Sequence, residues 1–199
     1  MSIRKRTDLN EYKWDTFFDE FRQETPRAAV IISGAFLDSL LRDLIASFMI
    51  DEDNVVGELL GSDKNSETPL SSFGTRIKTA YCLGLISKAE YNDLKIIKKI
   101  RNKFAHKLHG YSFEEKEIVG LCNSLQKPVI LKVLPVIQKS HRDKFVITVS
   151  ILANQLGIKI LDVQRERRTV KDDMQLAQVI RVEGKSSVDE IGAKQPHEG

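Results

Sequence analysis

The chain has 199 residues, a length that fits one domain with a core of ordinary size. Apolar residues make up 41% of it and charged residues 30%, a balance that excludes an intrinsically disordered chain. The net charge of +3 and the pI of about 8.8 are only mildly basic, which excludes a protein dedicated to coating DNA.

The first 50 residues predict two helices. Four aromatic residues between positions 14 and 21 recur with helical spacing. The basic residues before them lead into no apolar signal-peptide core, so we expect a cytoplasmic protein. Thr25 followed by Pro26 marks the start of a second helix, which runs to about Met49. Its apolar residues cover most of its circumference, as is typical of the central helix of a bundle.

This second helix carries charges that argue against a membrane span. Three charged residues lie in the middle of the apolar stretch 28–50, where they would be costly in lipid. Two of them, Asp38 and Arg42, are one helical turn apart on an otherwise apolar face, so both charges need partners. We expect an intrahelical salt bridge. The alternative is that Asp38 reaches across the bundle to Arg101 or His106.

Shorter elements follow in the chain. Residues 53–60 predict a short helix that ends at Gly61, and residues 61–69 predict a polar loop. The pattern then predicts a helix over 70–83 and a tight turn at 84–86.

The next helix opens with a capping box, in which Ser87 and Glu90 each satisfy a free amide of the other, and it runs to about residue 108. The preceding helix, the turn and this helix superficially resemble a DNA-binding helix-turn-helix. However, the second helix has a broad apolar face to bury, and Glu90 and Asp93 near its start would repel phosphates. The pattern therefore argues against direct, sequence-specific DNA binding.

A second capping box, Ser112 with Glu115, predicts a helix to about residue 125. Residues 128–135 are ambiguous, because prolines flank a run rich in Val, Ile and Leu. A long helix with apolar periodicity is expected over about 142–163.

No alternating strand pair appears, so we expect an all-α fold: a single-domain helical bundle with long antiparallel helices over residues 1–165. Residues 166–199 predict a polar, partly disordered C-terminal tail. Cys82 and Cys122 have no partner at ligand spacing. We expect both to be small core residues in a reducing cytoplasm, with neither a disulfide nor zinc.

The helix after Ser87 separates two faces. Its apolar face is formed by Ile96, Ile97, Ile100, Phe104 and Leu108. Its polar arc is formed by Lys95, Lys98, Lys99, Asn102, His106 and His109. Arg101 borders the apolar face, about 140° round the helix from His106. A second copy of the helix could pair each Arg101 with the other copy's His106, which predicts a homodimer.

Three interpretations of this arc compete. In a structural one, Arg101 pairs with a carboxylate on a neighbouring helix, Asn102 bonds a backbone group and His106 lies in a packing interface. Metal binding by His106 and His109 is disfavoured, because no Asp, Glu or Cys joins them on that face. We expect no metal and no cofactor.

The third interpretation is chemistry on RNA. A neutral His106 would move a proton to or from a ribose hydroxyl, and Arg101 would hold the scissile phosphate. Asn102 would orient either group. The lysines of the arc would guide the nucleic-acid backbone without reading its sequence; they are Lys95, Lys98 and Lys99.

Several blocks of the sequence resemble the mannitol operon repressor (MltR) family of bacteria. The blocks are "AAVIISGAFLDSLLRDLIASFM", the "LLG" ending at Gly61, "PLSSFGTRIKTAYCLGLIS" from Pro69 and "LKIIKKIRNKFAHKLHGYSFEEKEIVGLCNSL" from Leu94. The resemblance covers about residues 26–160. It implies an all-helical fold and a transcriptional regulator that represses mannitol utilisation. Because the pattern argues against base reading, we expect such a regulator to act through another regulatory protein.

The string Arg101-Asn102-x-x-x-His106 also resembles the motif of HEPN domains, helical bundles that often dimerise around it. Some of these are metal-independent endoribonucleases, and others only bind nucleotides or proteins. Carried over, Arg101 and His106 would be the catalytic pair and Asn102 would assist. The leading hypothesis is therefore a regulator that is not an enzyme. The alternative is an RNA-binding protein or ribonuclease.

Overall fold

The computed structural model describes residues 21, 23–61, 68–107, 110–126, 140–165 and 168. Three predicted segments lie outside these residues: the helix predicted over residues 9–24, apart from its end, the ambiguous segment 128–135, and the tail from residue 166, apart from Arg168. The described part contains six helices and no strand, which confirms the all-α prediction.

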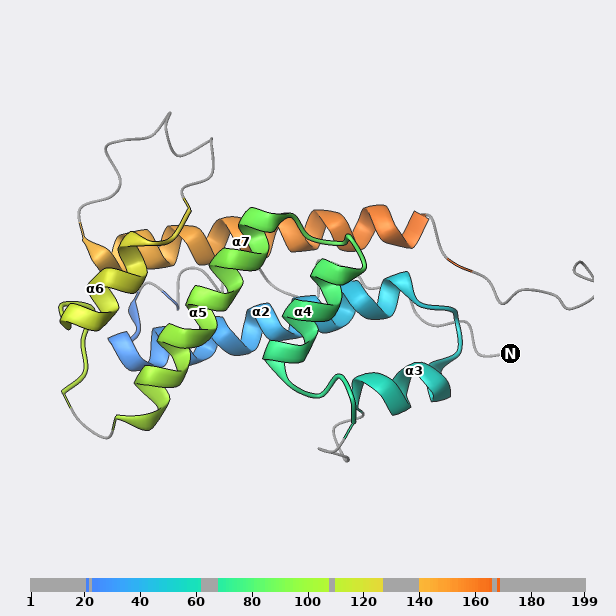
Figure 1. Ribbon diagram of the computed structural model, residues 1–199, viewed down its shortest axis with the longest axis horizontal. Coiled ribbons are helices and arrows are strands. Elements are labelled where there is room, and N and C mark those ends of the chain that lie inside the picture. The colour runs from blue at the N-terminus through green and yellow to red at the C-terminus, as the bar shows by residue number, and fades with distance from the viewer. Residues whose placement is uncertain are drawn as a thin grey trace, which may run out of the picture. The chain divides into compact units, whose positions relative to one another are not determined.

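Two long helices, α2 (Pro26–Phe48) and α7 (His141–Arg165), lie side by side (Figure 1). At one end Arg142 donates a hydrogen bond to the Glu24 carbonyl, and at the other Gln164 donates one to Ser47 Oγ at 3.4 Å. The start of α7 thus lies beside the start of α2, and the end of α7 lies beside the end of α2. The two helices therefore run parallel. The antiparallel arrangement predicted for the long helices is wrong for this pair, because the chain between them returns to its starting end.

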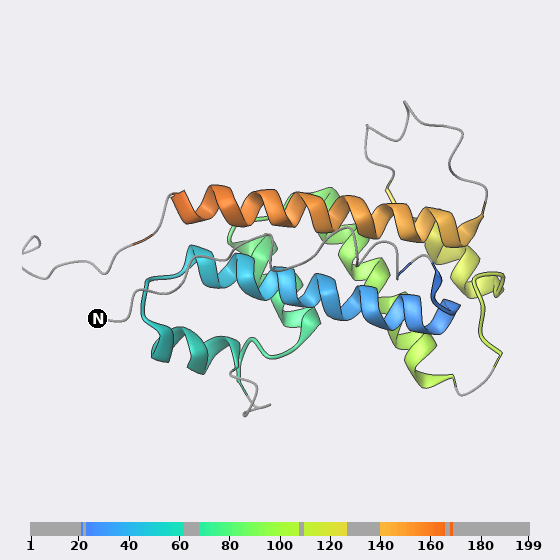
Figure 2. The same cartoon turned by 180° about the vertical axis from the view of Figure 1, so that it is seen from behind.

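Four shorter helices fill that connection. They are α3 (Asp53–Leu60), α4 (Phe73–Cys82), α5 (Lys88–His106) and α6 (Lys116–Asn123). Figures 1 and 2 show α4 and α5 covering one side of the pair formed by α2 and α7. Arg27 near the start of α2 donates to the Ala105 carbonyl near the end of α5 at 3.3 Å, so α5 runs antiparallel to α2.

Polar side chains fix where three of these helices begin. Thr25 Oγ1 accepts from the Ala28 amide at 3.2 Å, as expected for the cap of α2. Both bonds of the predicted capping box at Ser87 and Glu90 are present, at 3.3 and 2.6 Å. Helix α4 begins later than predicted, because Ser72 is its cap.

The predicted capping box at Ser112 and Glu115 is wrong. Ser112 Oγ accepts from the Glu114 amide at 3.2 Å, which closes a turn instead of a helix. Helix α6 begins only at Lys116, and Glu115 makes no side-chain capping bond to it. Ser112 and Glu115 have the spacing of a capping box, but the backbone after Ser112 does not enter a helix at that residue.

Helix α7 is long and apolar enough to cross a membrane by length and composition alone, a candidate that the sequence analysis did not raise. Its inner face is buried in the bundle through Phe145, Val149, Leu152, Leu156 and Ile160. Together with the contact of its two ends with α2, this burial makes α7 a core helix of the bundle.

The two cysteines differ from each other. Cys122 is 1% exposed, as predicted, and burial raises the pKa of its thiol to about 11. Cys82 is exposed, so its predicted place in the core is wrong. It follows the buried Ala80 by two residues, which places it about 200° round the helix from the buried face of α4.

Candidate functional site at the junction of α2, α4 and α5

Asp38 on α2 forms its ion pair with Arg76 on α4, with 2.8 Å between Oδ1 and Nη1. Arg76 is buried, and it also donates to the carbonyls of Leu70 at 2.8 Å and Leu60 at 3.0 Å. This one guanidinium therefore joins α2, α3 and the segment before α4. Arg76 was not among the predicted site residues, although it shares helical spacing with Phe73, Ile77 and Ala80 on the buried face of α4.

Arg42 does not form the predicted intrahelical salt bridge with Asp38. Its guanidinium donates to the Gly61 carbonyl at 3.1 Å and lies 3.8 Å from Asp43 Oδ1. Both expectations for Asp38 therefore named the wrong ion-pair partner. Burial raises the pKa of Asp38, while the hydrogen bond and charge of Arg76 and the charges of Arg101 and Arg42 oppose that rise.

Arg101 on α5 lies across α2 at Gly34. A Cβ atom on Gly34 would come within 2.9 Å of Arg101 Cγ and 3.4 Å of Cδ, so the arginine stem occupies the space that a side chain would fill. Asp38 follows Gly34 by one helical turn, and the charge of Arg101 acts on it. Arg101 Nε is buried, and it has no hydrogen-bond partner among the described residues.

Lys98 lies one turn before Arg101 and crosses to α4 in the same way. A Cβ atom on Gly74 would lie 3.1 Å from Lys98 Cε and would collide with Nζ, so the ammonium rests on the first turn of α4. Two glycines on two helices thus allow two cationic side chains of α5 to lie in the helix interfaces. Arg101 and Lys98 thus both lie where α5 meets its neighbours, Arg101 against α2 at Gly34 and Lys98 against α4 at Gly74.

The other predicted site residues lie outside this junction or at its edge. Lys99 is exposed, Asn102 is half-buried, and the ammonium of Lys95 lies 5.0 Å from the Tyr91 ring centroid. His106 is exposed as the last residue of α5. No described contact brings His106 to Arg101, so their role as a catalytic pair stays a prediction, as does the role of Asn102. Among the described residues, no group of His, Cys, Asp or Glu is suited to hold a metal ion.

The first turns of α5 face into the bundle. Glu90 is 6% exposed and pairs with Lys159 of α7 at 3.3 Å. Asp93 is 3% exposed and accepts from the Gln126 amide at 2.7 Å; burial raises its pKa to about 6. A recognition helix presents these turns to the major groove, and here their two carboxylates are packed against other elements while Lys88 and Ala89 are exposed.

Comparisons to known proteins bear on the family and the fold of the chain. A model of the family described as mannitol repressor matches residues 19–183, and the chain belongs to this family. The resemblance inferred from the sequence is confirmed. Mannitol operon repressors of two Escherichia coli strains, K12 and O6:H1, are each 26% identical over 97 residues, which is 49% of this chain and 50% of the relative. The chain thus matches about half the length of these curated relatives.

A solved structure shows the same fold. A chain in the X-ray structure of the MtlR-HPr complex from Escherichia coli superimposes with a TM-score of 0.57 at 20% identity. The match covers 72% of this chain and 98% of that chain. At this level of identity the likeness establishes the architecture.

Proposed function

We propose that this protein is a transcriptional repressor of the mannitol repressor family that is controlled by contact with another protein. The family match over residues 19–183 carries the proposal. The solved relative with the same fold is in complex with HPr, which makes an HPr protein the partner to test first. The repressor acts in the cytoplasm as a homodimer, and its direct target is another regulatory protein.

The burial at the start of α5 supports control through a protein rather than through base reading. Glu90 and Asp93 are buried there, and Lys159 and the Gln126 amide occupy their polar atoms. Entry of this buried face into a groove would break both contacts and place two carboxylates beside phosphates. The later part of α5 is more open, and its exposed residues Lys95, Lys99 and His106 are the ones we expect to contact a partner.

Calorimetric titration of purified protein with HPr from the same organism tests the partner. We expect saturable binding, which weakens when Lys99 and His106 are both changed to Ala and stays unchanged when exposed Glu58 on α3 is changed to Ala. The cellular test is repression of a mannitol-operon reporter in a strain that lacks its own repressor. Absence of both binding and repression would overturn the proposal.

The same purified protein separates the remaining hypotheses. Light scattering at micromolar concentration checks the homodimer, and a monomer would contradict it. Incubation with total RNA in the presence of a chelator checks the ribonuclease alternative. Cleavage that His106→Ala abolishes would replace the regulator by an enzyme as the leading function.

A further inference from the structure

The junction of α2, α4 and α5 carries more positive charge than its own carboxylates balance. Two of its arginines are paired: Arg76 with Asp38 at 2.8 Å, and Arg42 with Asp43 at 3.8 Å. Lys98 and Arg101 lie at the same junction and form no ion pair or hydrogen bond within the described residues. The charge of Arg101 acts on the Asp38 carboxylate, but that carboxylate forms its ion pair with Arg76. In the described part of the chain, these two cations thus have no counter-ion of their own.

Their placement differs from that of ordinary surface cations. Both are half-buried, and their stems lie where the side chains of Gly34 and Gly74 would be. Arg101 Nε is shielded from water and has no acceptor among the residues that the structure describes. A buried donor without an acceptor costs free energy, and a small movement of the side chain toward a ligand would relieve that cost. The two side chains start one helical turn apart on α5, so their charged ends can meet on a single small ligand.

We propose that Lys98 and Arg101 form a binding site for a phosphate monoester group at the junction of α2, α4 and α5. A guanidinium donates to two phosphate oxygens at once, and an ammonium adds a compact charge to a third. Two uncompensated positive charges match a dianion, whereas a nucleic-acid backbone offers one charge per phosphate.

Arginine side-chain NMR tests this site directly. The Arg101 Nε proton is shielded from water, so its ¹⁵N–¹H signal is expected to be observable and to shift saturably as inorganic phosphate is added at constant ionic strength. Glycerol phosphate should shift the same signal if the group can be carried on a small molecule. A response to inorganic phosphate alone would restrict the site to the free ion.

Two variants and one control locate the effect. Arg101→Gln and Lys98→Gln should each weaken phosphate binding about tenfold or more, as measured by calorimetry, because each removes charged hydrogen bonds. Lys99→Gln removes an equal charge from an exposed neighbour and should leave the affinity unchanged. Circular dichroism checks folding, and Lys98→Gln keeps the test valid if Arg101→Gln does not fold.

Three outcomes would overturn the proposal. They are no saturable shift at millimolar phosphate, equal losses in Lys98→Gln and Lys99→Gln, and tighter binding of an oligonucleotide that lacks terminal phosphates. The last result would assign the site to phosphodiesters. The HPr titration reports on the proposed function independently, since phosphate binding and partner binding are measured with different ligands.

Discussion

Gly34 decides where Arg101 can lie. We predict that Gly34→Ala destabilises the protein by about 1–2 kcal/mol, although alanine is the better helix former, because the new methyl group would meet Arg101 Cγ at 2.9 Å. Urea unfolding followed by circular dichroism measures the change. The same variant should also lower phosphate affinity, since the arginine must leave its place.

Gly57 supplies the matched control for this prediction. It lies within helix α3, and a Cβ atom there would meet nothing within 4 Å. Gly57→Ala should therefore stabilise the protein by roughly 0.5–1 kcal/mol through helix propensity. If Gly34→Ala stabilises to the same degree, the close contact between Gly34 and Arg101 is refuted.

The raised pKa of Asp93 predicts that its contribution to the free energy of unfolding falls as pH rises. Its folded pKa of about 6 lies above the ordinary value of 3.8, so between these values the folded protein holds a proton that the unfolded chain releases. The resulting stability is present below about pH 4 and is lost as pH rises through 6. Asp93→Asn keeps an oxygen for the Gln126 amide, and it should exceed the parent protein's stability by about 1 kcal/mol at pH 7 but not at pH 4.

Thermal unfolding across this pH range checks the difference between the two proteins. Asp162→Asn, which changes an exposed carboxylate on α7, serves as the control and should follow the parent protein. A parallel pH profile for Asp93→Asn and the parent would show that Asp93 is not the group responsible.

At the scale of residues, the sequence predicted which side chains border the core but not which ones they meet. Arg101 was placed at the edge of the apolar face, and it lies at the interface with α2. The partner of Asp38 was missed, because Arg76 is far from it in the sequence and only the packing of α4 on α2 brings them together. Helical periodicity describes one helix at a time, and an ion pair between helices depends on their crossing.

At the scale of helices, the two capping boxes offer a direct comparison. Ser87→Ala should destabilise the protein by about 1 kcal/mol, because Ser87 Oγ holds the Glu90 amide at the start of α5. Ser112→Ala removes a hydrogen bond in a turn before α6. It should lower the free energy of unfolding by only a few tenths of a kcal/mol, as is typical of a surface substitution. Equal losses of unfolding free energy in the two variants would contradict the assignment of their caps.

This comparison also shows why helix starts are only partly predictable. Ser87 and Ser112 both precede a glutamate by three residues, and only the first forms the reciprocal pair. Local sequence offers the donors and acceptors of a cap. The fold decides whether the backbone enters the helix there, and before α6 it follows a turn that buries Phe113 among Phe104 and Phe145.

At the scale of the whole bundle, α2 contacts α3, α4, α5 and α7. A substitution that weakens the packing of α2 should therefore destabilise all of these helices. Leu41 on α2 is fully buried, and Leu41→Ala should cost about 2–5 kcal/mol. Leu59 on α3 is 38% exposed, and Leu59→Ala should cost well under half of that. Hydrogen exchange in α5 and α7 should rise with Leu41→Ala, and protection that is lost in α2 alone would argue against a single cooperative unit.

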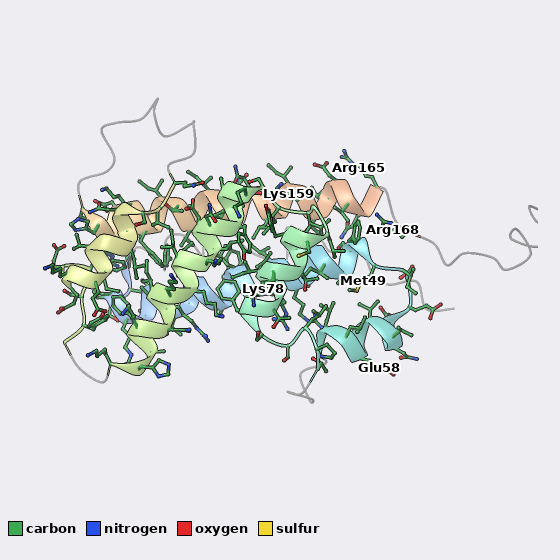
Figure 3. The ribbon with its side chains drawn as sticks, in the orientation of Figure 1. Met49, Glu58, Lys78, Lys159, Arg165 and Arg168 are labelled. Atoms are coloured by element: carbon green, nitrogen blue, oxygen red, sulfur yellow. The ribbon has the colours of Figure 1, made fainter. Side chains whose placement is uncertain are left out.

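The parallel course of α2 and α7 has an electrostatic consequence. Peptide dipoles of parallel neighbours reinforce each other, so the ends at Phe48 and Arg165 together present two partial negative poles. Arg165 is exposed at this end, and the guanidinium of Arg168 lies 4.1 Å from the centre of the Phe48 ring; Figure 3 labels both arginines at this end of the bundle. Cations thus sit where the field of the backbone favours them, and added salt should loosen this end of the bundle before the other.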